Sequence, residues 1–197
     1  MIQTSEAVGD DERAGISDAF AEVLAYGRKV ARDLALTGVA EDSCRVQEAL
    51  PSEHKSGYGF YGLEDEVTAP VRARHRSIGG WRVHSRLLSE SLRLDEHGNQ
   101  EGIAVARTVR EIWLLRNGDL QEVTLTTDSH GTTTVDAAPL SEEVAVAIND
   151  REQWRQERTH QPGERLLHRT AILTPTVDEE CAGLEEVLTR LRSRMNG

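Results

Sequence analysis

Two aspartates and two histidines recur in one short pattern and are the residues best suited to metal chemistry. The pattern is Asp-x-His-Gly, at Asp95–Gly98 and again at Asp128–Gly131. Metal ligands must approach a single ion to about 2.0–2.1 Å. The strands predicted below would place the two histidines on the order of 20 Å apart, since each extended residue adds about 3.3 Å. Aspartate and glycine are also turn residues, so we interpret both patterns as turns and predict no metal site.

The other histidines show no spacing that predicts catalysis. His75 and His84 lie among arginines, whose positive charge favours the neutral ring, and His160 and His168 have no neighbouring nucleophile or acid at a useful spacing. The sequence also contains no glycine-rich phosphate loop, dinucleotide-binding fingerprint, nucleophile elbow or His-Glu-x-x-His motif. We therefore predict no catalytic residue and no cofactor, and we favour a protein that is not an enzyme.

An arginine-rich segment, residues 69–93, is the strongest candidate for binding. It carries 6 arginines against 1 acid, whereas residues 1–68 carry 14 acids against 6 bases and residues 94–197 carry 19 acids against 11 bases, for a net charge of −11. An acidic chain is repelled by phosphate backbones and anionic membranes, which disfavours both as partners. Arginine binds carboxylates through a planar fork of donors and is enriched at interfaces. The expected partner is therefore an acidic protein surface.

The candidate binding residues combine arginines with three aromatic residues. Ser56–Gly62 interleaves glycines with aromatic rings, which fits either a loop that stacks on a partner or an edge segment whose rings cover the core. The arginines are either exposed to a partner or paired with the acidic surfaces of flanking helices. The predicted partner-binding set is Arg72, Arg74, Arg82, Arg86, Arg110, Tyr58, Phe60 and Tyr61.

Three classes of function fit these features. The favoured one is a non-enzymatic interaction protein, such as an adaptor, chaperone or inhibitor, that binds an acidic partner through an arginine-rich sheet face. The first alternative is a small-molecule-binding protein or enzyme with an apolar pocket between a curved sheet and helices. The second is a nucleic-acid contact through the arginines. The residues expected to line an apolar pocket are Leu88, Leu92, Ala104 and Ala106.

Strand-like sequence between residues 80 and 137 predicts four strands connected as an antiparallel meander. Asn117-Gly118 is typical of a two-residue turn with positive φ at both positions, which would place Leu115 opposite Leu120. For the first two strands, apolar matching places Trp81 opposite Leu115. The helix-covered face is predicted to carry Trp81, Val83, Leu87, Val109, Trp113 and Leu115. The other face is predicted to carry Arg82, His84, Arg86, Arg110 and Arg116 near the Asn-Gly turn. Val71–Arg76 alternates as a further strand.

Helical patterns occur in the sequence both before and after these strands. Ser17 is expected to cap a helix that ends near Gly38, and the C-terminal segment shows a capping box at Thr176 and Glu179. Residues 40–51 are compatible with a short helix. A helix capped by Ser141 is expected to continue through a strongly charged stretch at residues 155–158 until Gln161-Pro162-Gly163 stops it, and residues 166–173 are expected to be extended.

The sequence thus predicts an α+β fold, a four- to five-stranded curved antiparallel meander packed on one face by the N-terminal and C-terminal helices. Residues 1–15 are expected to be a flexible acidic tail and residues 16–197 a single domain. No apolar run approaches the roughly 20 residues of a membrane span, and the first residues lack the features of a signal peptide. Cys44 and Cys181 fit two reduced thiols, so a cytoplasmic location is expected. The sequence predicts no oligomeric state.

Overall fold

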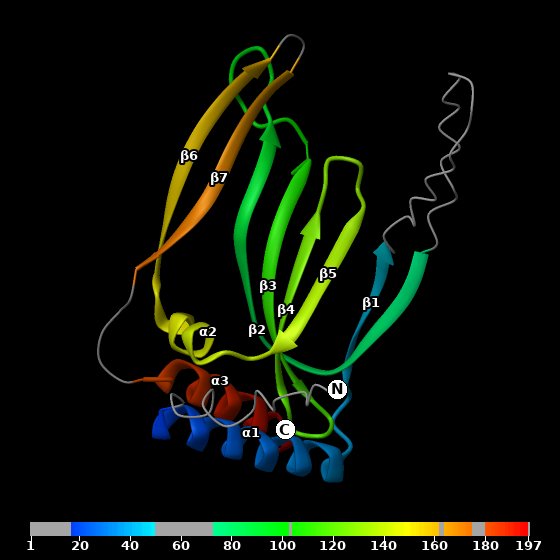
Figure 1. The fold of residues 1–197 in the computed structure, drawn as a ribbon, viewed down its shortest axis with the longest axis vertical. Helices are drawn as coiled ribbons and strands as arrows, with labels where there is room; N and C mark the ends of the chain where they lie inside the picture. Colours follow the sequence, from blue (N-terminus) through cyan, green and yellow to red (C-terminus); the bar gives the residue numbers. More distant parts are fainter. Residues whose placement is uncertain (1–16, 50–72, 103, 162–163, 175–179, 197) are drawn as a thin grey trace, which may run out of the picture.

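The computed structural model of the protein describes residues 17–49, 73–102, 104–161, 164–174 and 180–196. One antiparallel sheet stands on a layer of helices, as Figure 1 shows. The strands are β1 (Asp42–Ala49), β2 (Ala73–Arg93), β3 (Ala106–Leu115), β4 (Leu120–Thr127), β5 (Thr133–Pro139), β6 (Arg151–Gln161) and β7 (Glu164–Thr174). The helices are α1 (Asp18–Thr37), α2 (Glu142–Val146) and α3 (Ala182–Ser193), with the 3-10 turns η1 (Ala147–Asn149) and η2 (Arg194–Asn196).

Helix α1 begins and ends as its sequence predicts. The Ser17 side chain accepts a hydrogen bond from the backbone N–H of Phe20 at 3.2 Å, and Gly38 ends the helix with a φ of 70°. Helix α3 packs beside α1 and buries Leu184, Leu188 and Leu191 against it and the sheet. The capping box predicted at residues 176 and 179 lies outside the described residues.

The sheet has the order β5-β4-β3-β2-β7-β6, and β1 pairs with the first half of β2. The predicted α+β class is therefore confirmed, but the described part of the chain has a sheet of seven strands rather than four or five. Strand β2 is central because its 21 residues pair in turn with β1, β3 and β7. The meander of β2 to β5 is the part that the sequence predicts.

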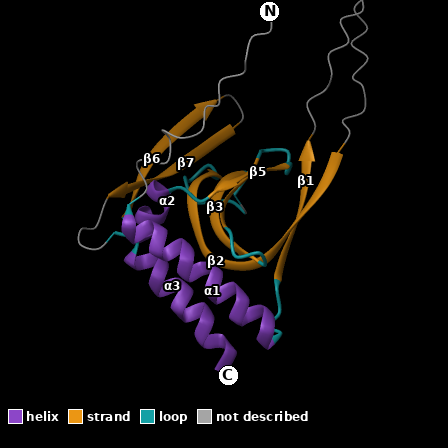
Figure 2. Cartoon of the chain, turned by 60° about the horizontal axis from the view of Figure 1, so that its bottom comes forward, coloured by secondary structure: helices purple, strands orange, loops and turns teal. Residues whose placement is uncertain are grey.

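Gly80 lies where β2 changes partner. It pairs with Asp42 of β1 on one side and Leu115 of β3 on the other, with a φ of 150°. A side chain there would run into the backbone carbonyl of Leu114, so glycine permits the close approach. Beyond this point β2 curves so strongly that β1 lies beside β5, and Figure 2 shows the resulting curl of strands β1 to β5.

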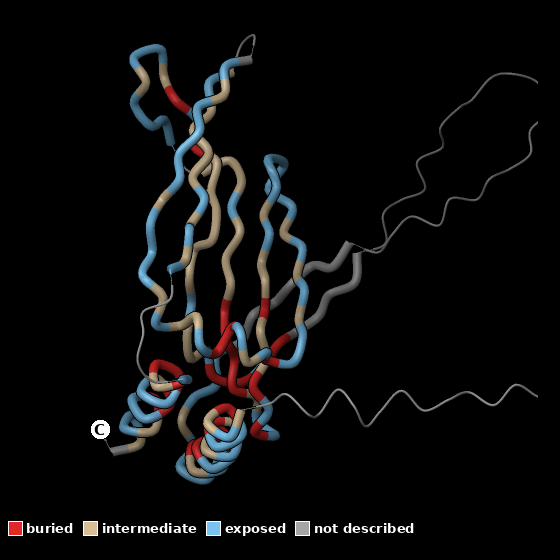
Figure 3. The backbone as a smooth tube through the Cα atoms, turned by 60° about the vertical axis from the view of Figure 1, so that its left-hand side comes forward, coloured by how far each residue is buried: buried red, intermediate tan, exposed pale blue. Residues whose placement is uncertain are grey.

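The core lies on both faces of the sheet at its lower end. On one face Trp81, Ile112 and Leu114 pack against α1 and α3, and on the other Trp113 packs with Ile78 and Val123 inside the curl. Figure 3 shows that most buried residues gather where the sheet meets the helices, whereas the strands above are half-buried or exposed, apart from Leu92 of β2 and the adjoining Leu94 at the far end. We call the face that packs against α1 and α3 the helix face, and the face inside the curl, which carries Trp113, the inner face.

The turn at Asn117-Gly118 contains three residues rather than the two that were predicted. Leu115 pairs with Asp119 through a hydrogen bond from its N–H to the Asp119 carbonyl at 2.8 Å, and only Gly118 has positive φ, at 92°. A type I turn followed by a glycine in this conformation is the usual three-residue connection. Leu114 therefore lies opposite Leu120, which shifts the predicted register of β3 and β4 by one residue.

The predicted register of β2 and β3 is also wrong at its lower end, although Leu87 does lie opposite Val109. Trp81 lies opposite Leu114, not Leu115, and the ladder has irregularities between Arg82 and His84 and again between Leu87 and Ser89. Trp113 consequently faces away from Val83, which packs toward the helices. Alternation could not reveal this, because β3 is buried on both faces over Glu111–Leu114.

Two segments expected to be helical are strands. Residues 42–49 form β1, and the helix capped by Ser141 ends at Val146, after which residues 151–161 form β6. Helix propensity is a weak signal that tertiary pairing overrides. Here β6 forms 11 residue pairs with β7, whose extended conformation was predicted.

Candidate interaction faces of the sheet

A row of four aliphatic residues crosses the inner face above the core. Leu87 lies opposite Val109, Val109 opposite Leu125, and Leu125 opposite Val135, so that one residue comes from each of β2 to β5. Directly opposite residues on neighbouring strands point to the same side of a sheet. All four are half-buried rather than buried. We call this set the aliphatic row.

A buried carboxylate lies just below the aliphatic row on the same face. Glu111 is 4% exposed, and its two oxygens accept hydrogen bonds from Trp113 Nε1 at 2.8 Å and from Arg82 Nη1 at 3.1 Å. A buried carboxylate needs such partners, because an unpaired charge in this setting is very unfavourable. The Arg82 side chain remains 52% exposed. A partner molecule can therefore contact this ion pair at the arginine and not at the buried carboxylate.

A second group of charges lies just above the aliphatic row. Arg169 of β7 bonds Glu90 of β2 at 2.8 Å and lies over the ring of Trp154 at 4.8 Å. Arg107 of β3 pairs in register with Glu90 and is exposed. The aliphatic row thus has Arg82 on one side and Arg107 on the other.

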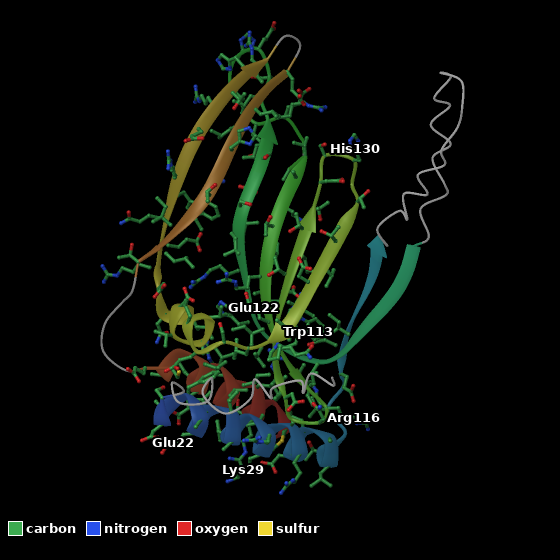
Figure 4. All side chains as sticks on the ribbon, in the orientation of Figure 1. Glu22, Lys29, Trp113, Arg116, Glu122 and His130 are labelled. Carbon is green, nitrogen blue, oxygen red and sulfur yellow. The ribbon has the colours of Figure 1, made fainter. Side chains whose placement is uncertain are left out.

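The other two predicted arginines that can be described face the helices. Arg86 donates hydrogen bonds to the carbonyls of Ala147 at 2.7 Å and Ile148 at 2.8 Å, which are the first two residues of the turn η1. Arg110 forms an ion pair with Glu122, with 3.0 Å between Nε and Oε1 but no aligned hydrogen bond at Nε. Figure 4 shows Glu122 within the sheet above Trp113. Both arginines hold elements of this chain together.

His84 lies beside these arginines in the angle between the sheet and α2. It lines a cavity of only about 10 Å³ together with Arg86, Arg110 and Val144. Burial lowers the pKa of His84 below its ordinary value of 6.5, and the charge of Arg86 lowers it further. The ring is therefore held in its neutral form.

Acidification should destabilise the protein through His84. Its pKa is higher in the unfolded chain, so its stabilising effect is complete above about pH 6.5 and is lost as the pH falls through the folded pKa. We expect urea unfolding at about pH 7.5 and about pH 5.5 to show a smaller loss of stability in His84→Gln than in the wild type. His130→Gln, at the exposed tip of the β4–β5 hairpin (Figure 4), should keep the wild-type loss. Equal losses in all three proteins would contradict this role.

The two Asp-x-His-Gly patterns form turns. Asp95 accepts hydrogen bonds from the N–H groups of His97 and Asn99, and Asp128 accepts them from those of His130 and Thr132. The N–H of Asn99 is the main reason why the pKa of Asp95 is lowered. Within the described ranges, no group of three or more acidic, histidine or cysteine side chains is arranged to hold a metal ion.

The first of these turns borders an open hollow at the far end of the sheet. The hollow has a volume of about 560 Å³. Its lining is formed by Leu94, Asp95, Glu96, Glu101, His160, Glu164 and Arg165.

The remaining predicted site residues cannot be placed. Arg72, Tyr58, Phe60 and Tyr61 lie outside the described residues, and so does the side chain of Arg74. The structure thus separates Arg82 from Arg86 and Arg110, which lie on opposite faces. The aliphatic row and Arg107 were missed by the sequence prediction. The signal is the alternation of Arg107, Val109 and Glu111, because alternate residues of a strand share one face of the sheet.

Comparison of the chain with protein-family models, with curated proteins and with solved structures found no match. Among the described residues, no helix combines the length and apolar character needed to cross a membrane.

Proposed function

We propose that this is a non-enzymatic interaction protein that binds an acidic partner protein through the inner face of its sheet. The aliphatic row carries the proposal. It continues the apolar inner face beyond the core, where four half-buried aliphatic side chains lie in register between Arg82 and Arg107. Apolar contact area with arginine at its margin is the composition that favours protein–protein binding.

The two arginines favour a partner segment that carries carboxylates. Arg107 is exposed, and the half-exposed Arg82 has donor groups beyond the one that bonds Glu111. Arginine can bind a carboxylate through two parallel hydrogen bonds, which gives direction as well as affinity. An apolar partner strand or helix with acidic residues on both sides of its apolar positions would fit this arrangement.

Arg86 and Arg110 are not part of this proposal, because they bond elements of the chain on the helix face. Arg72, Arg74, Tyr58, Phe60 and Tyr61 remain predicted contributors that lie outside the description. The two cavities described above are not lined by Leu88, Leu92, Ala104 or Ala106. Among the described residues, neither cavity is therefore the apolar pocket that the small-molecule alternative predicts.

A pair of matched variants tests the proposal. The double variant Arg107→Glu, Leu125→Ser changes the inner face, and Thr108→Glu, Thr124→Ser introduces the same two residues one position away on the same strands, on the helix face. Each protein is used at equal amounts to recover partners from the native host, with quantitative mass spectrometry and a thermal melt to confirm folding. The inner-face variant should recover at least about 10-fold less of a specific acidic partner than the wild type does, which is equivalent to about 1.4 kcal/mol of binding free energy.

The control variant should recover that partner at the wild-type level. If both variants melt like the wild type and recover the same proteins in the same amounts, the inner face is not the binding surface. If the lost partner is a nucleic acid, or if recovery falls steeply with salt for any nucleic-acid sequence, the second alternative takes precedence.

A further inference from the structure

Strand β6 is a free edge of the sheet in the part of the chain that the structure describes. The strand order ends at β6, and its one described partner is β7. All described side chains of residues 151–160 are exposed except those of Trp154 and Thr159, which are half-buried. Figures 1 and 2 show no described element beyond its outer side. An edge strand presents unpaired N–H and C=O groups that can bond another strand.

When β6 is paired antiparallel with a second copy of itself, residues of opposite charge can lie directly opposite each other. About Gln156, the middle residue of the strand, Arg155 lies opposite Glu157, and Glu152 opposite His160. Trp154 would lie opposite Arg158, and Gln153 opposite Thr159. Opposite charges and arginine–aromatic pairs stabilise neighbouring strands when they face each other directly. No like charges meet in this register.

Symmetry restricts the other registers. Two copies of one strand can pair antiparallel only about an axis perpendicular to the sheet, and each residue then pairs with one of the same face. The register centred on Arg155 would place Arg155 against itself, and that centred on Glu157 would place Glu157 against itself. Each of these two registers would place two like charges directly opposite each other, which is destabilising. Of the registers that symmetry allows, only that centred on Gln156 pairs the whole of Arg151–Gln161.

We propose that a second copy of this chain pairs with β6 in that register, so that two sheets join into one continuous antiparallel sheet. The paired edge is about 35 Å long. Charged side chains on an edge strand generally hinder addition of unrelated strands, and here their order permits addition of the same strand. Because the axis is perpendicular to the sheet, the inner faces of both copies point to the same side. The proposal does not depend on the proposed function.

Cysteine cross-linking tests the register. Residues directly opposite lie within disulfide range, since their Cα atoms are about 4.5–5.5 Å apart and a disulfide spans about 4.4–6.8 Å between Cα atoms. Gln156→Cys should therefore give a covalent dimer under mild oxidation of the purified full chain. Gln153→Cys is the matched control, because it is equally exposed but its two copies would lie about 20 Å apart. The wild type sets the background from Cys44 and from Cys181, which is a buried free thiol.

Charge reversal tests the pairing without cross-links. Sedimentation velocity at protein concentrations up to the order of 100 μM should detect a wild-type dimer. Arg155→Glu should weaken its self-association about 10-fold or more, and Arg155→Glu with Glu157→Arg should restore it. A thermal melt at low concentration should be the same for all, because the ion pair of Arg155 with Glu157 within one chain is exposed.

Three results would overturn the proposal. They are a wild type that stays monomeric at the highest concentration, equal cross-linking through positions 153 and 156, and a dimer that Arg155→Glu leaves unchanged.

Discussion

Replacing Trp113 with alanine is expected to lower the free energy of unfolding by about 3–5 kcal/mol. The ring is 2% exposed and packs with Ile78 and Val123 inside the curl of the sheet. Its removal leaves a cavity, and it also removes the N–H that donates to the buried Glu111. The expected loss is therefore among the largest for any single residue of the sheet. Urea unfolding followed by far-UV circular dichroism measures it without relying on tryptophan fluorescence.

Trp113→Phe separates the two contributions. It keeps most of the aromatic volume but deletes the hydrogen-bond donor together with a small part of the ring, so we expect a smaller loss of about 1–3 kcal/mol. A loss below about 1 kcal/mol for the alanine variant would show that Trp113 is not buried as described.

Replacing Gly80 with alanine should also destabilise the protein, by at least about 2 kcal/mol. The added methyl group would meet the backbone at Leu114 and Leu115, which cannot move without breaking the β2–β3 ladder. The φ of 150° is a further obstacle for a residue with a side chain.

Gly79→Ala is the matched control, one residue earlier in β2. Its nearest neighbour would be Glu41 Oε2 at 3.7 Å, an ordinary contact, and Gly79 does not have positive φ. We expect a change within about 1 kcal/mol. Equal effects of the two substitutions on the urea midpoint would show that Gly80 is not where the close approach of β2 and β3 occurs.

The helices α1 and α3 and the meander could be predicted because their signals are local. The Ser17 cap and the spacing of apolar residues define α1, and turn residues mark the ends of β2 to β5. The C-terminal helix follows from the spacing of Leu184, Leu188 and Leu191. Each of these depends on residues that are near one another in the sequence.

Registers could not be predicted, because they depend on single residues at irregular positions. Arg82 and Arg86 would share a face in a regular strand, being four residues apart, but the irregularity after Arg82 places them on opposite faces. The candidate site changes accordingly, since Arg82 lies on the inner face with Trp113 while Arg86 bonds η1. Strand β6 was missed for a different reason, because its highly charged sequence gains its conformation from pairing with β7.

A photo-activated cross-linking residue on β4 provides the most direct test of the proposed function. Placed at Leu125 in the aliphatic row and expressed in the native host, it should form a covalent adduct with one acidic protein. The same residue at Thr126, which is more exposed but points to the helix face, should not form that adduct. An adduct of the same mass from both positions, or one at position 125 formed only with a second copy of this chain, would contradict binding of an acidic partner on the inner face.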